Sequence, residues 1–383
     1  MSSDVYKIAV VIPKYGLVGG AEGFAAELTE RIAANDRYEI HVFANKWLNE
    51  SPRITFHKIP IISFPKFLAP VSFAYFAGLR ISRMNFDLIH THERIFTADL
   101  FTMHGIPHRV WVTEVRNKSM SLFDVATRWV EKCLVRNQRC KRFLTVSRLA
   151  QDKFLQEYNN VDNNRVQVIH PGVDVQRFRK LKREFCREEV RKNLGIDSKE
   201  LIILFVSMNF EIKGLAELMA GLAKFKSKCF AKTFRLLIIG KGNVKRFGRL
   251  AQQLGIKEHV LFLGVVPKET LDRIYLAGDI FSLLSRFDTF GLVVLEAMAA
   301  SLPVIISGNV GAKDLVSRGI NGFVLDQAFN PDEIADKIGL LAKEEPRPRI
   351  AEAAFKTASM YTWEHTARKM ENIYEELLGD GSL

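Results

Sequence analysis

The chain has 383 residues, of which 48% are hydrophobic and 26% are charged, and its formal net charge is +12. This length predicts two domains, since one domain usually holds about 100–200 residues. The composition excludes a disordered or low-complexity chain. The positive charge favours acidic partners, which include nucleic acid, anionic lipid and phosphorylated substrates, and charge alone does not choose among them.

Three features concern the cellular compartment. The N-terminal segment MSSDVYKIAVVIP has no basic region before its apolar run, so it does not resemble a signal peptide. The longest apolar stretch, Phe67–Leu79, is shorter than the roughly 20 residues that span a bilayer. The cysteines form neither a CxxC pair nor a metal-ligand spacing with histidine, so we expect reduced thiols in a cytosolic protein and no metal site. They are Cys133, Cys140, Cys186 and Cys229.

In the first half of the chain, short apolar runs alternate with amphipathic helical patterns. Continuous apolar runs are typical of strands in a parallel sheet that is covered on both faces. The expected strands are Lys7–Ile12, Glu39–Ala44, Asp87–His92 and Phe143–Ser147. The expected helices are Ala21–Ala34, Ser121–Cys140 and Arg148–Tyr158.

The second half repeats this alternation. Its expected strands are Leu201–Ser207, Arg235–Gly240, Val260–Gly264, Ile280–Ser285 and Pro303–Ser307. A very apolar helix is expected at Leu292–Ala300. Two successive βαβ series predict an α/β fold with two doubly wound, Rossmann-like domains.

The domain boundary is expected at the segment HPGVD, His170–Asp174. It contains Pro-Gly, follows a short strand at Val166–Ile169 and precedes a polar, basic segment. Ligands of open α/β sheets bind beyond the carboxyl ends of the strands. We therefore expect the chemistry in the loops that follow the strands, in a cleft between the two domains.

The loop Lys14–Phe24 follows the first expected strand and opens the first helix. Gly19 and Gly20 would let the backbone approach a ligand, and the helix N-terminus favours an anion. A tight strand-to-helix turn explains the same residues equally well. The glycines do not form GxGxxG, so a nicotinamide or flavin site is not indicated.

The segment DLIHTHE, Asp87–Glu93, places two histidines at the carboxyl end of an expected strand. His92 is suited there to hydrogen-bond a sugar or a phosphate, or to transfer a proton, although such a histidine is often structural. Asp99, seven residues later, is a second candidate for polar work at the cleft.

Lys213 stands before Gly214 at the start of another expected helix. It is placed to reach a phosphate with help from the helix N-terminus, or else it is a solvated lysine beside a helix cap.

The segment Ser285–Ile305 carries the strongest signal. Phe290-Gly291-Leu292 opens the apolar helix, whose first-turn amides suit a diphosphate, and Asp288 precedes it. Glu296 lies among apolar neighbours, where a carboxylate needs a partner, and it is suited to bind two hydroxyls of a ribose.

This segment resembles the retaining glycosyltransferases of family 4, which have the GT-B fold. Their signature is an acidic pair around Phe-Gly-Leu, followed by Glu-Ala-Met-Ala and Leu-Pro-Val, and the pair corresponds to Asp288 and Glu296. The resemblance covers nearly the whole chain. Its other matches are Gly19-Gly20-Ala21-Glu22, the histidine strand end, HPGVD followed by Arg177-Phe178, Lys213-Gly214, Asn321–Leu325 and the tail Tyr361–Leu378.

The resemblance implies an N-terminal acceptor domain, residues 1–172, on which a final helix of residues 361–378 packs back. It also implies a C-terminal nucleotide-sugar donor domain, residues 173–360. His92, or else His90, matches the family's active-site histidine, Asp99 matches an aspartate near the acceptor, and Asp288 would face the donor sugar. The residues implied to bind the donor are Gly19, Gly20, Lys213, Arg286, Phe290, Gly291, Leu292 and Glu296. Such enzymes keep the anomeric configuration and usually need no metal or other cofactor.

Two positions depart from the family pattern. Asp288 is one methylene shorter than the usual glutamate, and the usual strand-end arginine is replaced near Met208-Asn209, with Arg286 nearby. Within the family, SMNFEIKG and TADLFTMHGIPHRVW look most like lipopolysaccharide core glycosyltransferases. That likeness implies transfer of a hexose, from a donor such as a UDP-sugar, to a lipid-linked saccharide at the inner face of the cytoplasmic membrane.

The segment 105–145 interleaves basic residues with Trp111, Phe123 and Trp129. This pattern suits contact with an anionic membrane surface or a phosphorylated acceptor, and a solvated helix face explains the charges nearly as well. The basic residues are Arg109, Arg116, Lys118, Arg128, Lys132, Arg136, Arg139, Lys141 and Arg142.

Other functions stay open at this point. They are a family-4 transferase of exopolysaccharide or glycolipid synthesis, a nucleotide-sugar 2-epimerase of related fold, and a non-catalytic nucleotide-binding protein that docks on membranes. Nucleic-acid binding is suggested by the charge alone, and no nucleic-acid-binding motif supports it.

Overall fold

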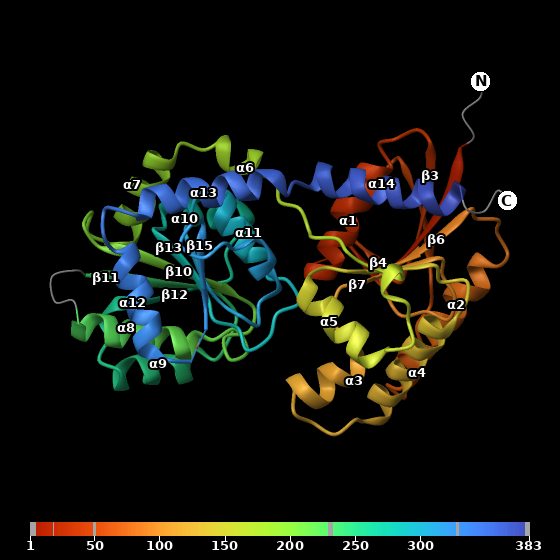
Figure 1. The fold of residues 1–383 in the computed structure, drawn as a ribbon, viewed down its shortest axis with the longest axis horizontal. Helices are drawn as coiled ribbons and strands as arrows, with labels where there is room; N and C mark the ends of the chain where they lie inside the picture. Colours follow the sequence, from red (N-terminus) through yellow and green to blue (C-terminus); the bar gives the residue numbers. More distant parts are fainter. Residues whose placement is uncertain (1–4, 18, 49–50, 229–232, 327–328, 380–383) are drawn as a thin grey trace. The chain divides into compact units, whose positions relative to one another are not determined.

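The computed structural model describes residues 5–17, 19–48, 51–228, 233–326 and 329–379. The chain divides into two compact units (Figure 1). Unit 1 contains the described residues up to Gly172 and those from Trp363 onward, and unit 2 is Val173–Thr362.

Unit 1 is built on a parallel sheet of seven strands in the order β5-β3-β1-β6-β7-β8-β9. The strands are β1 (Tyr6–Val11), β3 (Tyr38–Ala44), β5 (Ile54–Lys58), β6 (Leu88–Thr91), β7 (Leu100–Met103), β8 (Arg142–Thr145) and β9 (Val166–Val168). Two short strands, β2 (Lys14–Tyr15) and β4 (Lys46–Trp47), form a separate parallel pair. The central strands are buried along their length, as continuous apolar runs predict.

Helices of unit 1 cover this sheet. They are α1 (Gly20–Ile32), α2 (Leu68–Ile81), α3 (His108–Val110), α4 (Leu122–Arg136), α5 (Arg148–Glu157) and α14 (Trp363–Gly379). Ser121 starts α4 with a reciprocal capping box to Asp124, and Ser147 caps α5, because their hydroxyls accept first-turn amides. Although α1 and α14 are more than 300 residues apart in sequence, they lie side by side and are joined by an Arg31–Glu364 ion pair (Figure 1).

Unit 2 has a parallel sheet of six strands in the order β12-β11-β10-β13-β14-β15. They are β10 (Leu201–Ser207), β11 (Phe234–Gly240), β12 (Val260–Gly264), β13 (Ile280–Leu283), β14 (Val304–Ser307) and β15 (Gly322–Leu325). Its helices are α6 (Gln176–Arg179), α7 (Arg183–Leu194), α8 (Leu215–Lys228), α9 (Val244–Gln253), α10 (Lys268–Ala277), α11 (Leu292–Ala299), α12 (Pro331–Leu341) and α13 (Arg347–Met360).

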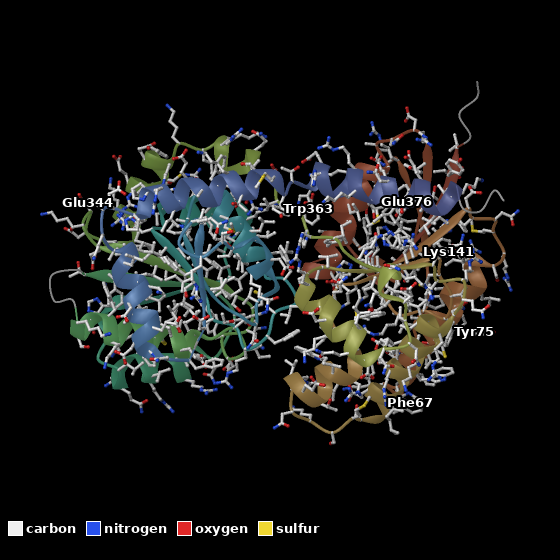
Figure 2. The ribbon with its side chains drawn as sticks, viewed as in Figure 1. Phe67, Tyr75, Lys141, Glu344, Trp363 and Glu376 are labelled. Atoms are coloured by element: carbon white, nitrogen blue, oxygen red, sulfur yellow. The ribbon has the colours of Figure 1, made fainter. Side chains whose placement is uncertain are left out.

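These two parallel sheets with their helices confirm the predicted α/β class of two Rossmann-like halves. The expected strands Leu201–Ser207 and Val260–Gly264 have the bounds of β10 and β12. Within the described residues, five strands were not among those expected from the sequence, and each has five residues or fewer: β2, β4, β5, β7 and β15. The apolar stretch Phe67–Leu79 forms most of α2, and its residue Tyr75 is exposed at the margin of unit 1 (Figure 2).

Two expectations about composition can be compared with the described residues. Cys133, Cys140 and Cys186 are free thiols, and burial raises the pKa of Cys140 to about 12, which suits an inert side chain. Cys229 lies outside the described residues. Within the described ranges, no helix is long and apolar enough to cross a membrane, and no group of acidic, histidine and cysteine side chains is arranged to hold a metal.

Candidate active site

In unit 2, the loops after β10 and β13 bring Lys213 and Asp288 together. These strands are neighbours in the parallel sheet, so their carboxyl ends open on the same edge. The Lys213 Nζ lies 2.6 Å from Oδ2 of Asp288, and both side chains are largely buried. The sequence therefore identified two residues that the fold places in contact across 75 positions of chain.

Two glycines are required for this arrangement. Gly214 has φ +78°, and a Cβ built there would lie 2.0 Å from the carbonyl oxygen of Leu284, so a side chain would push the two loops apart. Gly291 has φ +85°, and a Cβ there would crowd Val310 and the Asp288 carboxylate at 3.0 and 3.3 Å. Both glycines let the backbone pass close to the Lys213–Asp288 pair.

The helix α11 begins directly after Gly291, and no side chain caps it. The amide of Val294 already donates to the Gly291 carbonyl at 2.8 Å. The amides before it, of Leu292 and Val293, stand at the start of the helix, where an anion is favoured. Phe290 is buried, and its amide donates to Oδ1 of Asp288 at 3.3 Å. The predicted residues Asp288, Phe290, Gly291 and Leu292 are thus contiguous around one helix N-terminus.

Glu296 lies one turn further along α11, and its carboxylate has two partners within unit 2. Arg177 of α6 makes an ion pair with Oε1 at 2.9 Å, and the hydroxyl of Tyr275 donates to Oε2 at 3.1 Å. Arg177 also lies 3.2 Å from Oδ1 of Asp272, which is buried. Burial raises the pKa of Asp272 to about 6, with Glu296 contributing and Arg177 opposing.

Arg286 does not join this group. Its guanidinium forms an ion pair with Glu217 of α8 at 3.0 Å and lies over the ring of Phe329. Met208, at the end of β10 where the family has an arginine, is exposed. The assignment of Arg286 to donor binding stays a prediction, and the contacts in the structure do not favour it.

In unit 1, His92 follows β6 and contacts a third histidine. Its Nδ1 lies 2.9 Å from Nε2 of His104, and the two rings stack with centroids 5.1 Å apart. His90 lies within β6 and is fully buried. Its ring is hydrogen-bonded to the Tyr374 hydroxyl of α14 and to the Thr102 hydroxyl. Within the part of the chain that the structure describes, Nε2 of His92 is buried and has no hydrogen-bond partner.

Burial keeps these histidines neutral. It lowers the pKa of His90 and of His104 to about 3, and it lowers the pKa of His92 well below the usual range. One of the two neutral rings, His92 or His104, donates in their mutual hydrogen bond. His92 therefore has one free ring nitrogen, which can donate to or accept from a ligand without a change of charge.

The assignment of Asp99 to the site stays a prediction, and the position and contacts of Asp99 do not favour it. Asp99 precedes β7, so it lies at the amino ends of the strands, whereas His92 lies at the carboxyl ends. Its carboxylate accepts the Ile89 amide at 2.8 Å and pairs with Arg139 at 2.8 Å. The strand β7 was not among the expected strands, and in this structure Asp99 holds β6, β7 and Arg139 together.

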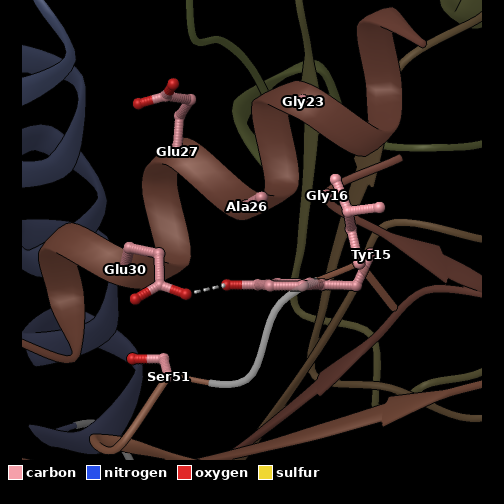
Figure 3. Close-up of a pocket in the computed structure, with 8 residues that line it drawn as sticks. Tyr15, Gly16, Gly23, Ala26, Glu27, Glu30 and Ser51 are labelled. Carbon is pink, nitrogen blue, oxygen red and sulfur yellow. Dashed lines mark hydrogen bonds between the residues drawn. The ribbon is translucent and has the colours of Figure 1, made fainter. Parts of the chain in front are cut away.

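The loop with Gly19 lies between β1 and α1, as the sequence predicts. Gly20 is the first residue of α1, and the carboxylate of Glu22 lies against Gly19. Nearby, a hollow of about 480 Å³ lies along α1, where the Tyr15 hydroxyl donates to Glu30 at 3.2 Å (Figure 3). Because the carboxylate of Glu22 lies at this helix start, the loop is less suited to bind an anion than the start of α11.

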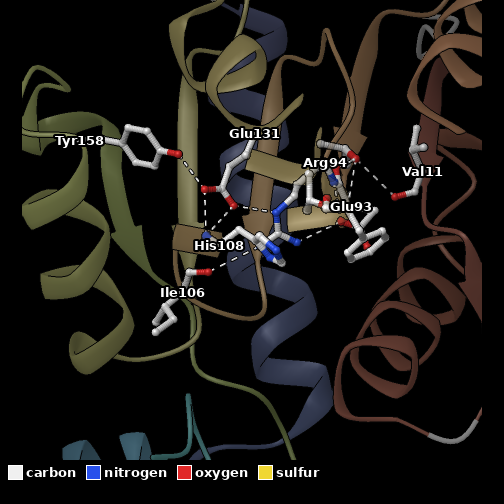
Figure 4. Close-up of polar contacts among 10 residues, drawn as sticks. Val11, Glu93, Arg94, Ile106, His108, Glu131 and Tyr158 are labelled. Atoms are coloured by element: carbon white, nitrogen blue, oxygen red, sulfur yellow. Dashed lines mark hydrogen bonds and ion pairs between the residues drawn. The ribbon is translucent and has the colours of Figure 1, made fainter. Parts of the chain in front are cut away.

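The basic segment 105–145 contains a buried polar network (Figure 4). The Glu131 carboxylate is fully buried, and it accepts hydrogen bonds from Arg94 at 2.6 Å, Tyr158 at 2.6 Å and the His108 amide at 3.0 Å. Other acids from outside the segment also pair with its cations. Glu157 binds Arg109 and Arg128, and Asp99 binds Arg139.

Sequence reasoning missed Arg177, Tyr275, Asp272 and His104 as members of these groups. Arg177 was noted only as a match to the family after HPGVD, and no local pattern links it to Glu296. The sequence did indicate that Glu296 has a cationic partner, because a carboxylate on an apolar helix requires a cation somewhere in the fold. It did not indicate which residue supplies that cation.

Two family descriptions match the chain. Glycosyltransferase Family 4 matches residues 18–177, and Glycosyl transferases group 1 matches residues 186–357, so together they leave only the ends and a short stretch between them. The chain belongs to these glycosyltransferases. The first match covers most of unit 1 and the second covers most of unit 2.

Known proteins agree with this assignment. The D-inositol 3-phosphate glycosyltransferase of Corynebacterium urealyticum is 29% identical over 330 residues, which is 82% of this chain and 77% of that protein. The structure of WaaG, a glycosyltransferase involved in lipopolysaccharide biosynthesis, matches with a TM-score of 0.79 at 18% identity and covers 96% of this chain and 99% of WaaG. Anabaena HepE in complex with UDP-glucose matches with a TM-score of 0.72 at 18% identity, over 97% and 100% of the two chains. These structural matches confirm the GT-B fold.

Proposed function

We propose that this glycosyltransferase moves a hexose from a nucleotide-sugar donor, such as a UDP-sugar, to a lipid-linked saccharide, with retention of configuration and without a metal. The binding of a nucleotide-sugar donor is supported mainly by the arrangement around α11 in unit 2. Lys213 contacts Asp288 before the start of this helix, and Glu296 lies one turn inside it. HepE, a neighbour in fold, binds UDP-glucose, which supports UDP as the first donor to test.

In this proposal, the diphosphate and the ribose of the donor would each have a partner in unit 2. The first amides of α11 and the Lys213 ammonium would bind the diphosphate, and they would stabilise the charge that develops on it as the bond to the sugar breaks. Lys213 is now neutralised by Asp288, so phosphate binding would release that carboxylate toward the sugar. Glu296 would bind the ribose. His92, with its free ring nitrogen, would bind a hydroxyl of the reacting sugars.

A surface on unit 1 supports the lipid-linked acceptor. Along α4, side chains that are exposed, or half-buried in the case of Lys132, recur at intervals of three and four residues, so they form one stripe that is apolar first and then basic. The stripe is Leu122, Val125, Trp129, Lys132 and Arg136. An amphipathic helix with tryptophan and terminal cations suits an anionic membrane interface. WaaG, similar in fold, is described as acting in lipopolysaccharide biosynthesis, which makes a lipopolysaccharide core acceptor the first to test.

The donor is tested by thermal unfolding in the presence of UDP-, GDP-, ADP- and CMP-sugars, since a ligand that binds only the folded state raises its stability. We expect a shift with one nucleotide class, unchanged by EDTA and abolished in Glu296→Ala. A shift of equal size in Glu296→Ala would contradict the ribose assignment. Transfer with the selected donor, followed by NMR of the product linkage, then tests retention.

Membrane contact is tested by co-sedimentation with vesicles that contain anionic lipid. Charge reversal of Lys132 and Arg136 should release the protein, and the matched reversal of Lys192 and Lys356, exposed cations of unit 2, should not. Arg139 is left intact because it holds Asp99. Equal binding of both double variants would refute the α4 contact.

A second acceptor class is favoured by several relatives in sequence. Several curated relatives are D-inositol 3-phosphate glycosyltransferases, with 26–29% identity over most of the chain. Incubation of the selected donor with inositol phosphate and, separately, with a lipid-linked saccharide distinguishes the two. Donor turnover without any acceptor product would favour the 2-epimerase, and donor binding without turnover would favour a non-catalytic protein.

A further inference from the structure

The contacts of Glu296 within unit 2 carry an inference that rests on the proposed function. An ionised carboxylate has about four acceptor positions, two on each oxygen. Arg177 faces Oε1 in an ion pair at 2.9 Å, and the Tyr275 hydroxyl donates to Oε2 at 3.1 Å. Each oxygen therefore keeps at least one acceptor position, and the side chain is still 24% exposed. One position on each oxygen is what two neighbouring hydroxyls require.

Arg177 and Tyr275 hold the Glu296 carboxylate from two sides, one at each oxygen. Tyr275 is fully buried, so its hydroxyl cannot turn to water, and it also lies 3.5 Å from the Val293 carbonyl. Arg177 is held by Asp272 on one side and lies over the Phe178 ring, with its guanidinium carbon 4.6 Å from the ring centroid. Neither Arg177 nor Tyr275 has to move to bind a ligand, which is the condition for a preorganised acceptor.

The charges of the group support the same conclusion. Glu296 and Asp272 are two acids beside one cation, Arg177. The guanidinium pairs both with Glu296, which is partly exposed, and with Asp272, which is buried. Without Arg177, the two acids would face each other across a largely buried space, and both would be desolvated without a partner. Arg177 therefore offsets the negative charge of both acids and orients Glu296.

We propose that Arg177, assisted by Tyr275, is a positioning residue that holds the Glu296 carboxylate so that the remaining acceptor positions on its two oxygens select a ligand with a pair of adjacent hydroxyls, as in the ribose of a nucleoside diphosphate. Asp272 positions Arg177 in turn. The selectivity is thus for the diol, and it is independent of the base and of the diphosphate.

The test compares the affinities of UDP, 2′-deoxy-UDP and 3′-deoxy-UDP by calorimetry, with the base replaced if the donor panel selects another nucleotide. The wild-type protein should prefer UDP to either deoxy form by about tenfold, since each removes one charge-assisted hydrogen bond. Arg177→Met should bind UDP about tenfold more weakly and the deoxy forms nearly as before, so the preference disappears. Arg177→Lys should restore part of it.

Two further variants separate a positioning role from a structural one. Arg273 lies on the same helix as Tyr275 and forms an ion pair with Glu189 at 2.5 Å. Arg273→Met removes this other arginine and should leave the preference for UDP over the deoxy forms unchanged. Tyr275→Phe keeps the ring and removes only the hydroxyl, so it tests the inference even if Arg177→Met does not fold. It should reduce the preference by several-fold.

The outcomes distinguish this inference from the proposed function. Loss of the ribose preference in Glu296→Gln but not in Arg177→Met, Arg177→Lys or Tyr275→Phe would overturn the positioning role alone. Absence of a preference in the wild-type protein, with unchanged UDP affinity in Glu296→Gln, would overturn the ribose site itself. Lower thermal stability of Arg177→Met with an unchanged preference would make the arginine purely structural.

Discussion

The buried histidine on β6 predicts how the stability of unit 1 depends on pH. His90 is fully buried, and its pKa of about 3 lies below the value of about 6.5 expected for an unfolded chain. Between these values the unfolded chain binds more protons than the folded one, so the stability contributed by neutral His90 is complete above pH 6.5 and is lost as the pH falls. From pH 7 to pH 5 the loss is about 2 kcal/mol for this residue.

The change to make is His90→Gln, which can still bond to Tyr374 and Thr102 but does not titrate. Urea unfolding at pH 7 and pH 5 should show that the variant loses about 2 kcal/mol less than the wild-type protein between the two values. Tryptophan fluorescence is the suitable signal, because all four tryptophans belong to unit 1. They are Trp47, Trp111, Trp129 and Trp363.

Tyr374→Phe is the matched control. It removes a hydrogen bond to His90 and keeps the imidazole, so it should lower stability at both pH values and leave the wild-type dependence on pH. An identical loss between pH 7 and pH 5 in the wild-type protein and His90→Gln would refute the reasoning, because it would show that His90 does not titrate on unfolding.

Three other predictions concern single positions. Glu131→Gln should cost about 3 kcal/mol in urea unfolding followed by tryptophan fluorescence, since it leaves the buried guanidinium of Arg94 without its closest acid; a change within experimental error would show that Glu93 suffices. Gly214→Ala should destabilise unit 2 by more than about 2 kcal/mol in calorimetry because its Cβ meets a carbonyl, whereas Gly195→Ala, with a similar φ and open space, should cost about 1 kcal/mol; equal costs would contradict the steric argument. Lys213→Ala should weaken UDP binding by about tenfold and uridine binding hardly at all, with Lys245→Ala as the control; equal losses for both ligands would exclude a phosphate contact.

The sequence was informative where one segment contains the whole signal. The stretch from Asp288 to Glu296 combines a turn, a glycine at positive φ and a buried acid, so its position at a helix start followed from local rules. The apolar strands β10 and β12 were recognised for the same reason, because a parallel strand buried on both faces has a continuous apolar pattern.

The sequence failed where a role depends on a partner far along the chain. Arg177 meets Glu296 across more than 100 residues, and His92 meets His104 only because β6 and β7 are neighbours in the sheet. Asp99 was expected beyond the end of a strand, whereas a strand of four residues, β7, begins directly after it. If a short strand is overlooked, a residue directly before it is assigned to the carboxyl edge of the sheet, although it lies at the amino edge. The composition of the segment does not reveal the difference.

The return of α14 to unit 1 has a consequence for biosynthesis. Unit 2 is a continuous segment whose ends are adjacent, since the Val173 amide donates to the Tyr361 carbonyl at 2.9 Å. On the ribosome its last residue, Thr362, emerges before Trp363 and Tyr374 do. Until then, the surface of Phe24 and the ring of His90 that these residues cover are open to water. The domain that is translated first is thus completed last, and a nascent chain stalled before α14 would expose an apolar surface suited to a chaperone.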